Sequence, residues 1–124
     1  MAQDIIADAL NRIMNAKKAQ KNELEILAYS RFLLSVLAIA KLHGFIKNYS
    51  VDNKKLKIEI AKLHGCKAIK PRYTVSVTEI EKYVKRYLPA KNIGIIIVST
   101  SKGLMTHQTA IEKNLGGSLI AYMF

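Results

Sequence analysis

Three consecutive hydroxyl side chains near the C-terminus are the residues of this chain best suited to chemistry. The segment Ser99–Gly103 reads Ser-Thr-Ser-Lys-Gly, and His107 follows it closely. A serine near a histidine can serve as a nucleophile, but the chain has no G-x-S-x-G nucleophile turn, and its few acids sit mostly on expected helix surfaces. We therefore expect no catalysis and no small-molecule substrate.

The same hydroxyl segment has a second interpretation. Small polar groups at fixed positions on a protein surface can hydrogen-bond base edges and 2′-hydroxyls of RNA. Spacing alone leaves that interpretation level with a plain serine-rich turn.

Metal and phosphate sites have little support in the sequence. His64 and Cys66 lie two residues apart, but the other two histidines are distant, whereas a zinc site usually needs four ligands arranged in pairs. Neither G-x-x-x-x-G-K nor G-x-G-x-x-G occurs, and Gly116-Gly117 is only a dipeptide. That dipeptide is either a helix C-cap followed by a turn or a point where the backbone must approach a partner closely. We expect no metal and no cofactor.

The charge balance is the strongest bulk signal. The chain of 124 residues has 20 Lys+Arg against 9 Asp+Glu, a formal net charge of +11. Folding does not need this excess, which raises self-repulsion, so a polyanionic partner is expected, and nucleic acid is favoured over a membrane surface. The basic residues gather in four places: Lys17, Lys18 and Lys21; Lys70 and Arg72 with Lys67; Lys82, Lys85 and Arg86 with Lys91; and Lys102 in the hydroxyl segment.

Tyrosines lie among these basic clusters. Tyr29, Tyr73, Tyr83 and Tyr87 could stack on bases or sugars of RNA. For Tyr83 and Tyr87 the alternative is simple, because residues four apart on a helix can pack together against a sheet. Both interpretations stay open at this point.

The cell compartment follows from weaker signals. The N-terminus has no basic region followed by an apolar segment, so no secretory signal is expected. The longest apolar stretch, residues 32–42, is too short to span a bilayer, and a single cysteine excludes an internal disulfide. A reducing cytoplasm fits these features.

The periodicity predicts an α+β fold in two small subdomains, residues 1–64 and 65–124. Ser30 is a good helix N-cap and Gly44 the matching residue after the helix, while Asp52-Asn53 marks a hairpin turn. The first subdomain is expected to have the order α-β-α-β-β: a helix over residues 3–15, a strand over 23–27, a helix from 30 to 43, and strands over 45–51 and 55–63.

The second subdomain is predicted to be β-rich with short helices. Thr78 and Glu81 have the spacing of a capping box, Pro89 ends the helix that follows, and Thr106 can cap a shorter one. The expected elements are a strand over residues 73–77, a helix over 79–88, a buried strand over 93–98, the segment 99–103 as a loop, a helix to about 114 and a strand over 118–123.

The C-terminal residues carry a specific resemblance. The stretch 97–107 with its Ser-Thr-Ser-Lys-Gly, and the stretch 115–122 with its Leu-Gly-Gly-Ser, strongly resemble the end of the universal small-subunit ribosomal protein S-eight family. Lys70-Pro71-Arg72-Tyr73 and residues 86–90, Arg-Tyr-Leu-Pro-Ala, resemble its archaeal and eukaryotic branch. Residues 8–13 and 30–46 match as well, so the resemblance covers essentially the whole chain. One departure is that Leu27-Ala28-Tyr29 stands where the family usually has Lys-Pro.

The resemblance implies a function. Proteins of this family bind a bulged helix in the central domain of small-subunit rRNA early in assembly, and aid formation of the subunit platform beside neighbouring ribosomal proteins. Matching positions put the specific contacts at Ser99, Thr100, Ser101, Gly116 and Gly117, and backbone contacts at Asp4, Asn11, Ser30 and Arg31. A free-standing RNA-binding translational regulator that uses the same surface is the alternative.

Overall fold

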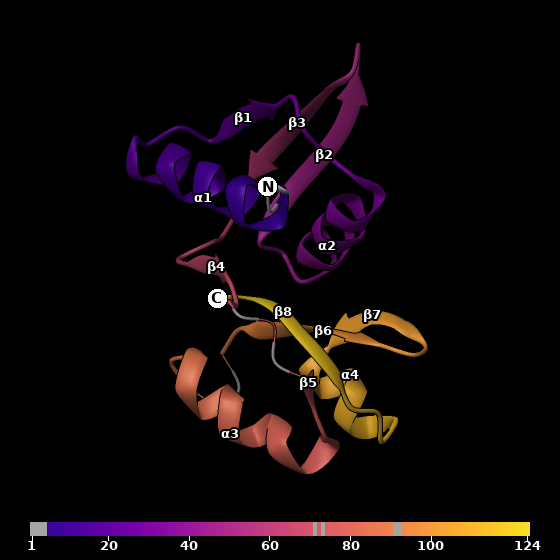
Figure 1. Cartoon of the computed structure of the whole chain (residues 1–124). Helices are drawn as coiled ribbons and strands as arrows, with labels where there is room; N and C mark the ends of the chain where they lie inside the picture. The colour runs from indigo at the N-terminus through magenta and orange to yellow at the C-terminus, as the bar shows by residue number, and fades with distance from the viewer. Residues whose placement is uncertain (1–4, 71, 73, 91–92) are drawn as a thin grey trace. The chain divides into compact units, whose positions relative to one another are not determined.

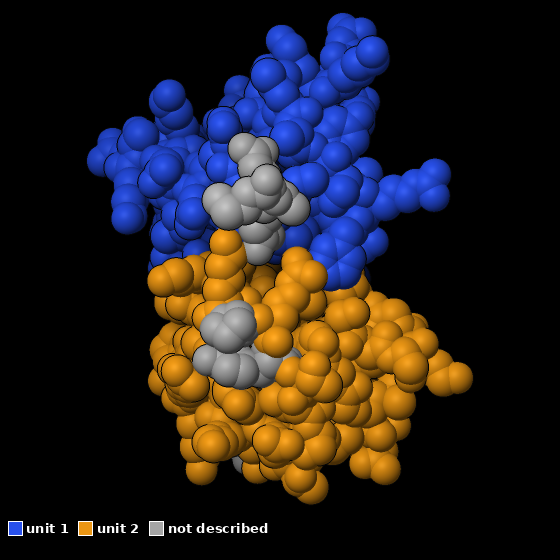
Figure 2. All heavy atoms as spheres, viewed as in Figure 1, with its two compact units in different colours: residues 1–66 blue, residues 67–124 orange. Residues whose placement is uncertain are grey.

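The chain divides into two units, residues 1–66 and 67–124, which are described separately (Figure 2). The computed structural model describes residues 5–70, 72, 74–90 and 93–124. Asp4 and Tyr73, both named as candidates from the sequence, lie outside the described residues. The fold class is α+β, as predicted, and each unit contains helices and an antiparallel sheet (Figure 1).

The first unit has the predicted order α-β-α-β-β. Its sheet runs β1-β3-β2, and all its pairings are antiparallel. Leu56 and Ile58 alternate with exposed lysines along β3 and are fully buried, as the sequence pattern indicated. The elements are α1 (Ile5–Lys18), β1 (Glu23–Ile26), α2 (Arg31–Leu42), β2 (Ile46–Asp52) and β3 (Lys55–Ile60).

The caps of α2 agree with the sequence prediction. The Ser30 hydroxyl accepts a hydrogen bond from the backbone N–H of Leu33 at 3.2 Å. Gly44 has a φ of +82°, the left-handed conformation that favours glycine after a helix. The buried side chains Leu33, Val36, Leu37 and Ala40 form one face of α2. Ala38 and Leu42 are exposed, so this apolar helix is not buried on all sides.

Two boundaries in the first unit differ from the prediction. Helix α1 continues to Lys18, so Lys17 and Lys18 form its last turn and do not belong to a connector. Cations there are favourable, because they lie at the negative end of the helix dipole. The hairpin turn is at Asn53-Lys54, one residue beyond the expected position, since Asp52 pairs with Lys55.

The second unit is built around strand β8. Its sheet has the order β4-β8-β6-β7, and β5 also pairs with β8. Ile96, Val98 and Leu119 of this sheet pack with Ile80 and Val84 of α3, and Ala110 of α4 joins the same core cluster. The elements are β4 (Cys66–Ala68), β5 (Thr74–Val75), α3 (Val77–Tyr87), β6 (Ile95–Thr100), β7 (Gly103–Thr106), α4 (His107–Glu112) and β8 (Gly117–Met123).

The predicted capping box of Thr78 and Glu81 is wrong. Helix α3 begins two residues earlier, with Ser76 as its N-cap and Glu79 as the acid of the box. The backbone N–H and the hydroxyl of Ser76 donate to Glu79 Oε1 at 3.3 and 2.9 Å. These hydrogen bonds lower the pKa of Glu79. Both Ser-x-x-Glu and Thr-x-x-Glu fit the same pattern here, and the earlier pair brings Val77 into the helix.

Candidate nucleic-acid interface

The hydroxyl segment is the tip of a β-hairpin and not a free loop. Ser99 and Thr100 belong to β6, where they pair with Leu104 and Gly103 of β7. Only Ser101 and Lys102 stand outside the strands, and both are exposed. Strand β7 was missed in the sequence, because Gly103 was taken as the end of a loop. The hairpin holds the hydroxyls at fixed positions on a strand that continues into the core.

Hydrogen bonds of the Thr100 hydroxyl hold this tip in place. Its Oγ1 donates to the carbonyl oxygen of Gly103 at 2.9 Å and accepts from the backbone N–H of Lys102 at 3.1 Å. Gly103, which follows the two tip residues, has a φ of +110°, a positive value that favours glycine. The hydroxyl of Thr100 is therefore occupied in positioning the turn, whereas Ser101 is left as the exposed hydroxyl at the tip.

The Gly116-Gly117 dipeptide lies against the same hairpin. A Cβ added to Gly117 would overlap the carbonyl oxygen of Ser99, and one added to Gly116 would lie 2.5 Å from the carbonyl oxygen of Val75. Of the two interpretations left open for this dipeptide, the helix C-cap is wrong, since Lys113 caps α4 and Asn114 takes the left-handed conformation after it, with a φ of 56°. The glycines therefore allow β8 to approach its neighbours closely.

This close approach creates a row of hydroxyls across three strands. Ser99 of β6 pairs with Ser118 of β8, which pairs in turn with Thr74 of β5. Directly paired residues of antiparallel strands share a face, and Thr74 Oγ1 and Ser118 Oγ lie 3.3 Å apart. Sequence reasoning missed Thr74 and Ser118, because the long-range pairing that joins them has no local signal. The Ser-Thr-Ser segment and the Gly-Gly turn are thus brought together, as the two halves of one surface.

The basic candidates of this unit are on its surface. Lys70 and Arg72 are exposed in the segment that precedes β5, and Lys102 is exposed at the hairpin tip. Lys82, Lys85 and Arg86 are exposed on α3. A set of exposed cations suits a phosphate backbone.

Tyr87 packs within its own unit, which favours the packing interpretation over stacking on RNA. Its ring centroid lies 6.3 Å from that of Tyr83 and 5.2 Å from that of Tyr122. Phe124 extends the series, with its ring 6.3 Å from that of Tyr122. The Arg86 guanidinium carbon lies 5.4 Å from the Tyr87 ring centroid, at cation–π distance. Both Tyr83 and Tyr87 are half-buried against the core.

The candidates of the first unit lie at its helix starts and on α1. Asn11 is exposed on α1, and Arg31 is exposed as the first residue of α2. The Ser30 hydroxyl caps the helix, whereas the Arg31 side chain is exposed to solvent.

Two residues considered for catalysis or metal binding, His107 and Cys66, have structural roles. His107 is buried, and its Nδ1 accepts a hydrogen bond from the backbone N–H of Ile96 at 3.1 Å. Cys66 is buried, its Sγ lies 3.7 Å from the carbonyl oxygen of Leu10, and burial raises the pKa of its thiol to about 12. Among the described residues, no group of three or more His, Cys, Asp or Glu side chains could hold a metal ion.

Helices in the described ranges are also too short or too polar to cross a membrane. The chain's own residues therefore offer a rigid, hydroxyl-bearing sheet surface with exposed cations nearby. This arrangement matches the chemistry of RNA recognition, in which cations bind phosphates and small polar groups contact base edges and 2′-hydroxyls.

Comparison with known proteins gives the family. A family model described as ribosomal protein S8 matches residues 4–124. The small ribosomal subunit protein uS8 of Nanoarchaeum equitans is 42% identical over 129 aligned residues, and the match covers 100% of both chains. The small ribosomal subunit protein uS8 of Archaeoglobus fulgidus is 41% identical, with the same complete coverage. Both relatives are archaeal, in agreement with the predicted branch, and the chain belongs to the ribosomal protein S8 family.

Proposed function

We propose that this protein is a structural constituent of the small ribosomal subunit that binds rRNA directly through the second unit. Its family consists of ribosomal proteins, so the protein is not an enzyme, and it acts in the cytoplasm as part of the ribosome. The observation that carries the RNA proposal is the hydroxyl row Thr74–Ser118–Ser99 beside the exposed Ser101 tip.

The physical reason is the rigidity of that surface. Ser99 and Ser118 sit on central strands, Thr100 ties down the hairpin tip, and the two glycines set the spacing between strands. Polar groups that are already held in place lose little conformational entropy when they bind, so a fixed hydroxyl surface can discriminate between RNA shapes. We place the specific contacts at Ser99, Ser101 and Ser118, with Thr100 and the glycines as positioning residues.

Electrostatic attraction supplies the sequence-independent part of binding. Residues 67–124 contain nine Lys and Arg against three acids. Lys70, Arg72 and Lys102 are exposed in the same unit as the hydroxyl row. They can therefore contact phosphates while the hydroxyl row contacts the bases and sugars of the RNA. Arg31 and Asn11 of the first unit provide a second set of backbone contacts in this proposal.

The RNA target that we propose is an irregular, bulged helix in the central domain of small-subunit rRNA. An intact A-form helix has a major groove too narrow for side chains, whereas a bulge exposes base edges and 2′-hydroxyls to small polar groups. Binding at such a site would order the RNA for later assembly of the platform, next to neighbouring small-subunit proteins.

A titration with two RNAs tests the proposal. One is a central-domain fragment with its bulged helix, and the other carries a fully paired helix of equal length, each titrated across a salt series. We expect the paired helix to bind at least about tenfold more weakly, on the scale of one or two lost polar contacts. Lys102→Ala should lower the salt slope by about one for both RNAs alike. Equal affinity for both RNAs would overturn the proposal, and preference for an mRNA hairpin would favour a free-standing regulator.

A further inference from the structure

Strand β1 of the first unit forms an open edge of its sheet. The order β1-β3-β2 leaves β1 paired on one side only among the described residues. The backbone carbonyl of Asn22 accepts from the N–H of Ile60 at 2.7 Å, so the backbone groups of residue 22 point toward β3. These directions alternate along an antiparallel strand, so the N–H and C=O groups of Glu23 and Glu25 point outward. Such unpaired groups can hydrogen-bond an added strand.

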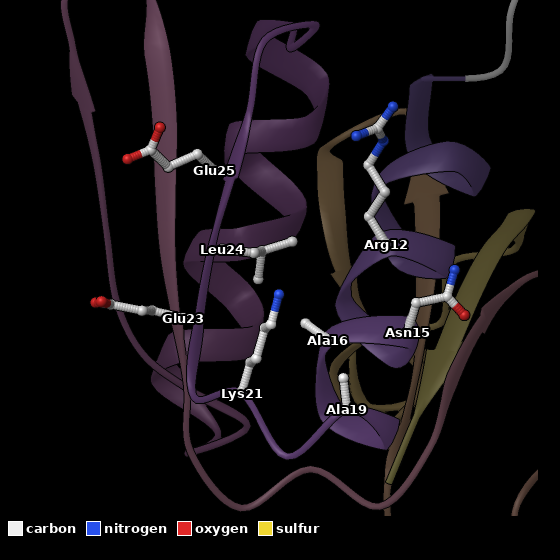
Figure 3. A pocket seen from close by; sticks show the side chains of 8 residues that line it. All are labelled: Arg12, Asn15, Ala16, Ala19, Lys21, Glu23, Leu24 and Glu25. Atoms are coloured by element: carbon white, nitrogen blue, oxygen red, sulfur yellow. The ribbon is translucent and has the colours of Figure 1, made fainter.

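A hollow of about 380 Å³ adjoins this edge, between β1 and α1. Figure 3 shows Leu24 pointing from β1 toward Ala16 of α1, while Glu23 and Glu25 point to the other side of the strand. Ala16 and Ala19 line the helix side together with Arg12 and Asn15, and Lys21, from the connection between α1 and β1, also lines the hollow. A strand edge next to a helix, with a partly apolar hollow between them, is a geometry in which an extended peptide can add to a sheet and insert alternate side chains.

The other face of β1 carries the carboxylates of Glu23 and Glu25, beside lysines of β3. Glu23 pairs with Glu59 of β3 in the sheet register, so two carboxylates lie opposite each other, and Glu25 is opposite Lys57. Like charges directly opposite are unfavourable. Within the described residues the only ion pair of this group joins Glu25 to Lys55, at 3.9 Å. Six of the nine acids of this basic chain are in residues 1–66, and two of them, Glu23 and Glu25, are on this edge strand.

We propose that the β1 edge binds an extended segment of another protein, which adds to the sheet as a fourth strand. The segment alternates between apolar residues, which enter the hollow beside Leu24, and Lys or Arg, which face Glu23 and Glu25. Alternation follows from the two-residue repeat of a strand, and the basic residues follow from charge complementarity with the exposed acids.

Other occupants fit less well. RNA phosphates would meet the carboxylates of Glu23, Glu25 and Glu59, so this edge is not part of the nucleic-acid interface. A second copy of the chain, pairing through the same edge, would bring the glutamates of one β1 against those of the other. A basic and apolar strand avoids both repulsions.

A peptide titration on the full chain, without RNA, tests this proposal separately from the proposed function. The probe is a fluorescein-labelled octapeptide of alternating lysine and valine, and its binding is followed by anisotropy. A peptide of the same composition, with its four valines together, controls for simple charge attraction. The double variant Glu23→Lys/Glu25→Lys is compared with Glu81→Lys/Glu112→Lys, which makes the same change in net charge on exposed residues of the second unit.

We expect the alternating peptide to bind at least about tenfold more tightly than the block peptide, and the Glu23/Glu25 variant alone to lose this preference. Hydrogen exchange gives the decisive readout, because the amides of Glu23 and Glu25 should become protected when the peptide is bound. Binding without protection of these two amides, equal loss in both double variants, or dimerisation in place of peptide binding would overturn the proposal.

A backbone variant keeps the test independent of charge. Glu25→Gln removes the carboxylate and keeps the outward N–H. Glu25→Pro removes both the carboxylate and the N–H, and it leaves the pairing with β3 in place, since proline is tolerated at an edge. We expect the proline variant to bind the alternating peptide at least about fivefold more weakly than the glutamine variant. Equal affinity of the two would show that no strand is added.

Discussion

The β2–β3 hairpin and the β6–β7 hairpin both end in a tip that carries a lysine, but they are closed by different means. In the first, Asn53 and Lys54 both adopt left-handed backbone conformations, with φ of 49° and 65°. In the second, Gly103 takes the positive φ, and the Thr100 hydroxyl before the turn is hydrogen-bonded to Lys102 and Gly103 at its end. The first tip thus places a non-glycine residue, Lys54, in an unfavourable conformation, whereas the second is fixed by side-chain hydrogen bonds.

This difference suggests why one hairpin suits recognition and the other does not. A tip that binds RNA specifically must keep its hydroxyls at defined positions, and the second hairpin is fixed both at its turn and beside it, where Gly117 lies against Ser99. The first hairpin has exposed charged residues and a turn of the two-residue kind that twisted strands prefer. Substitutions at the two hairpins distinguish these two ways of closing a turn.

The largest expected effect comes from Gly117→Ala. Its new methyl group would overlap the Ser99 carbonyl oxygen, a backbone atom that cannot move without breaking the pairing of β6 and β8. We expect the free energy of unfolding to fall by about 3 kcal/mol, the upper range for overpacking. Urea denaturation followed by circular dichroism measures it. Gly44→Ala is the control, with open space but a φ of +82°, and should lose only about 1 kcal/mol. If the two variants lost the same free energy of unfolding, the close approach of Gly117 to Ser99 would not limit the size of residue 117.

The next effect is on RNA binding. Ser101→Ala removes the exposed hydroxyl of the second tip and should weaken binding to the bulged rRNA fragment by about 1–3 kcal/mol, the scale of a lost polar contact. A filter-binding titration at constant salt measures it. The matched control is Ser50→Ala in the exposed part of the first hairpin, which should leave the affinity unchanged. If the two variants bound equally well, the contrast between the hairpins would have no role in recognition.

The sequence predicted much of this arrangement, because local signals determine most of it. Hydrophobic alternation identified β3, and Ser30 with Gly44 marked both ends of α2. Residue types singled out the Ser-Thr-Ser segment but did not distinguish an RNA contact from a plain serine-rich turn, and the family resemblance favoured the RNA contact. Each of these features depends on residues that are close together in the chain, so a single sequence is enough to predict them.

The rest of the site depends on long-range pairing. Thr74 and Ser118 are 44 residues apart, and only the alignment of β5 with β8 brings their hydroxyls together. The reason for Gly117 is likewise a contact with Ser99, which no local pattern shows. The start of α3 was misplaced for a different reason, because two overlapping pairs of residues satisfied the same capping pattern.

A smaller effect is expected from Thr100→Val, which keeps the side-chain shape and removes the hydroxyl. The Lys102 amide and the Gly103 carbonyl lose their partner, and stability should fall by about 1 kcal/mol. Hydrogen exchange of the Lys102 amide should accelerate by about fivefold on the same scale. Thr100→Ser should restore slow exchange, because it restores the hydroxyl. Unchanged exchange in the valine variant would show that the tip is held by its backbone alone, as in the first hairpin.

The smallest effect has opposite signs at the two tips. Lys54→Gly removes the steric cost of a left-handed lysine backbone at the first tip. Glycine also gives the unfolded state more chain entropy, which offsets part of this gain. The free energy of unfolding should therefore rise by about 0.5 kcal/mol in total. Lys102 has no positive φ, so Lys102→Gly removes no backbone strain and only increases the chain entropy of the unfolded state. The free energy of unfolding should therefore fall by about 0.5 kcal/mol. Both substitutions remove one positive charge, so general electrostatic effects act alike in the pair. Paired urea titrations measure the difference of about 1 kcal/mol, and a common sign would mean that the two tips impose the same backbone constraint.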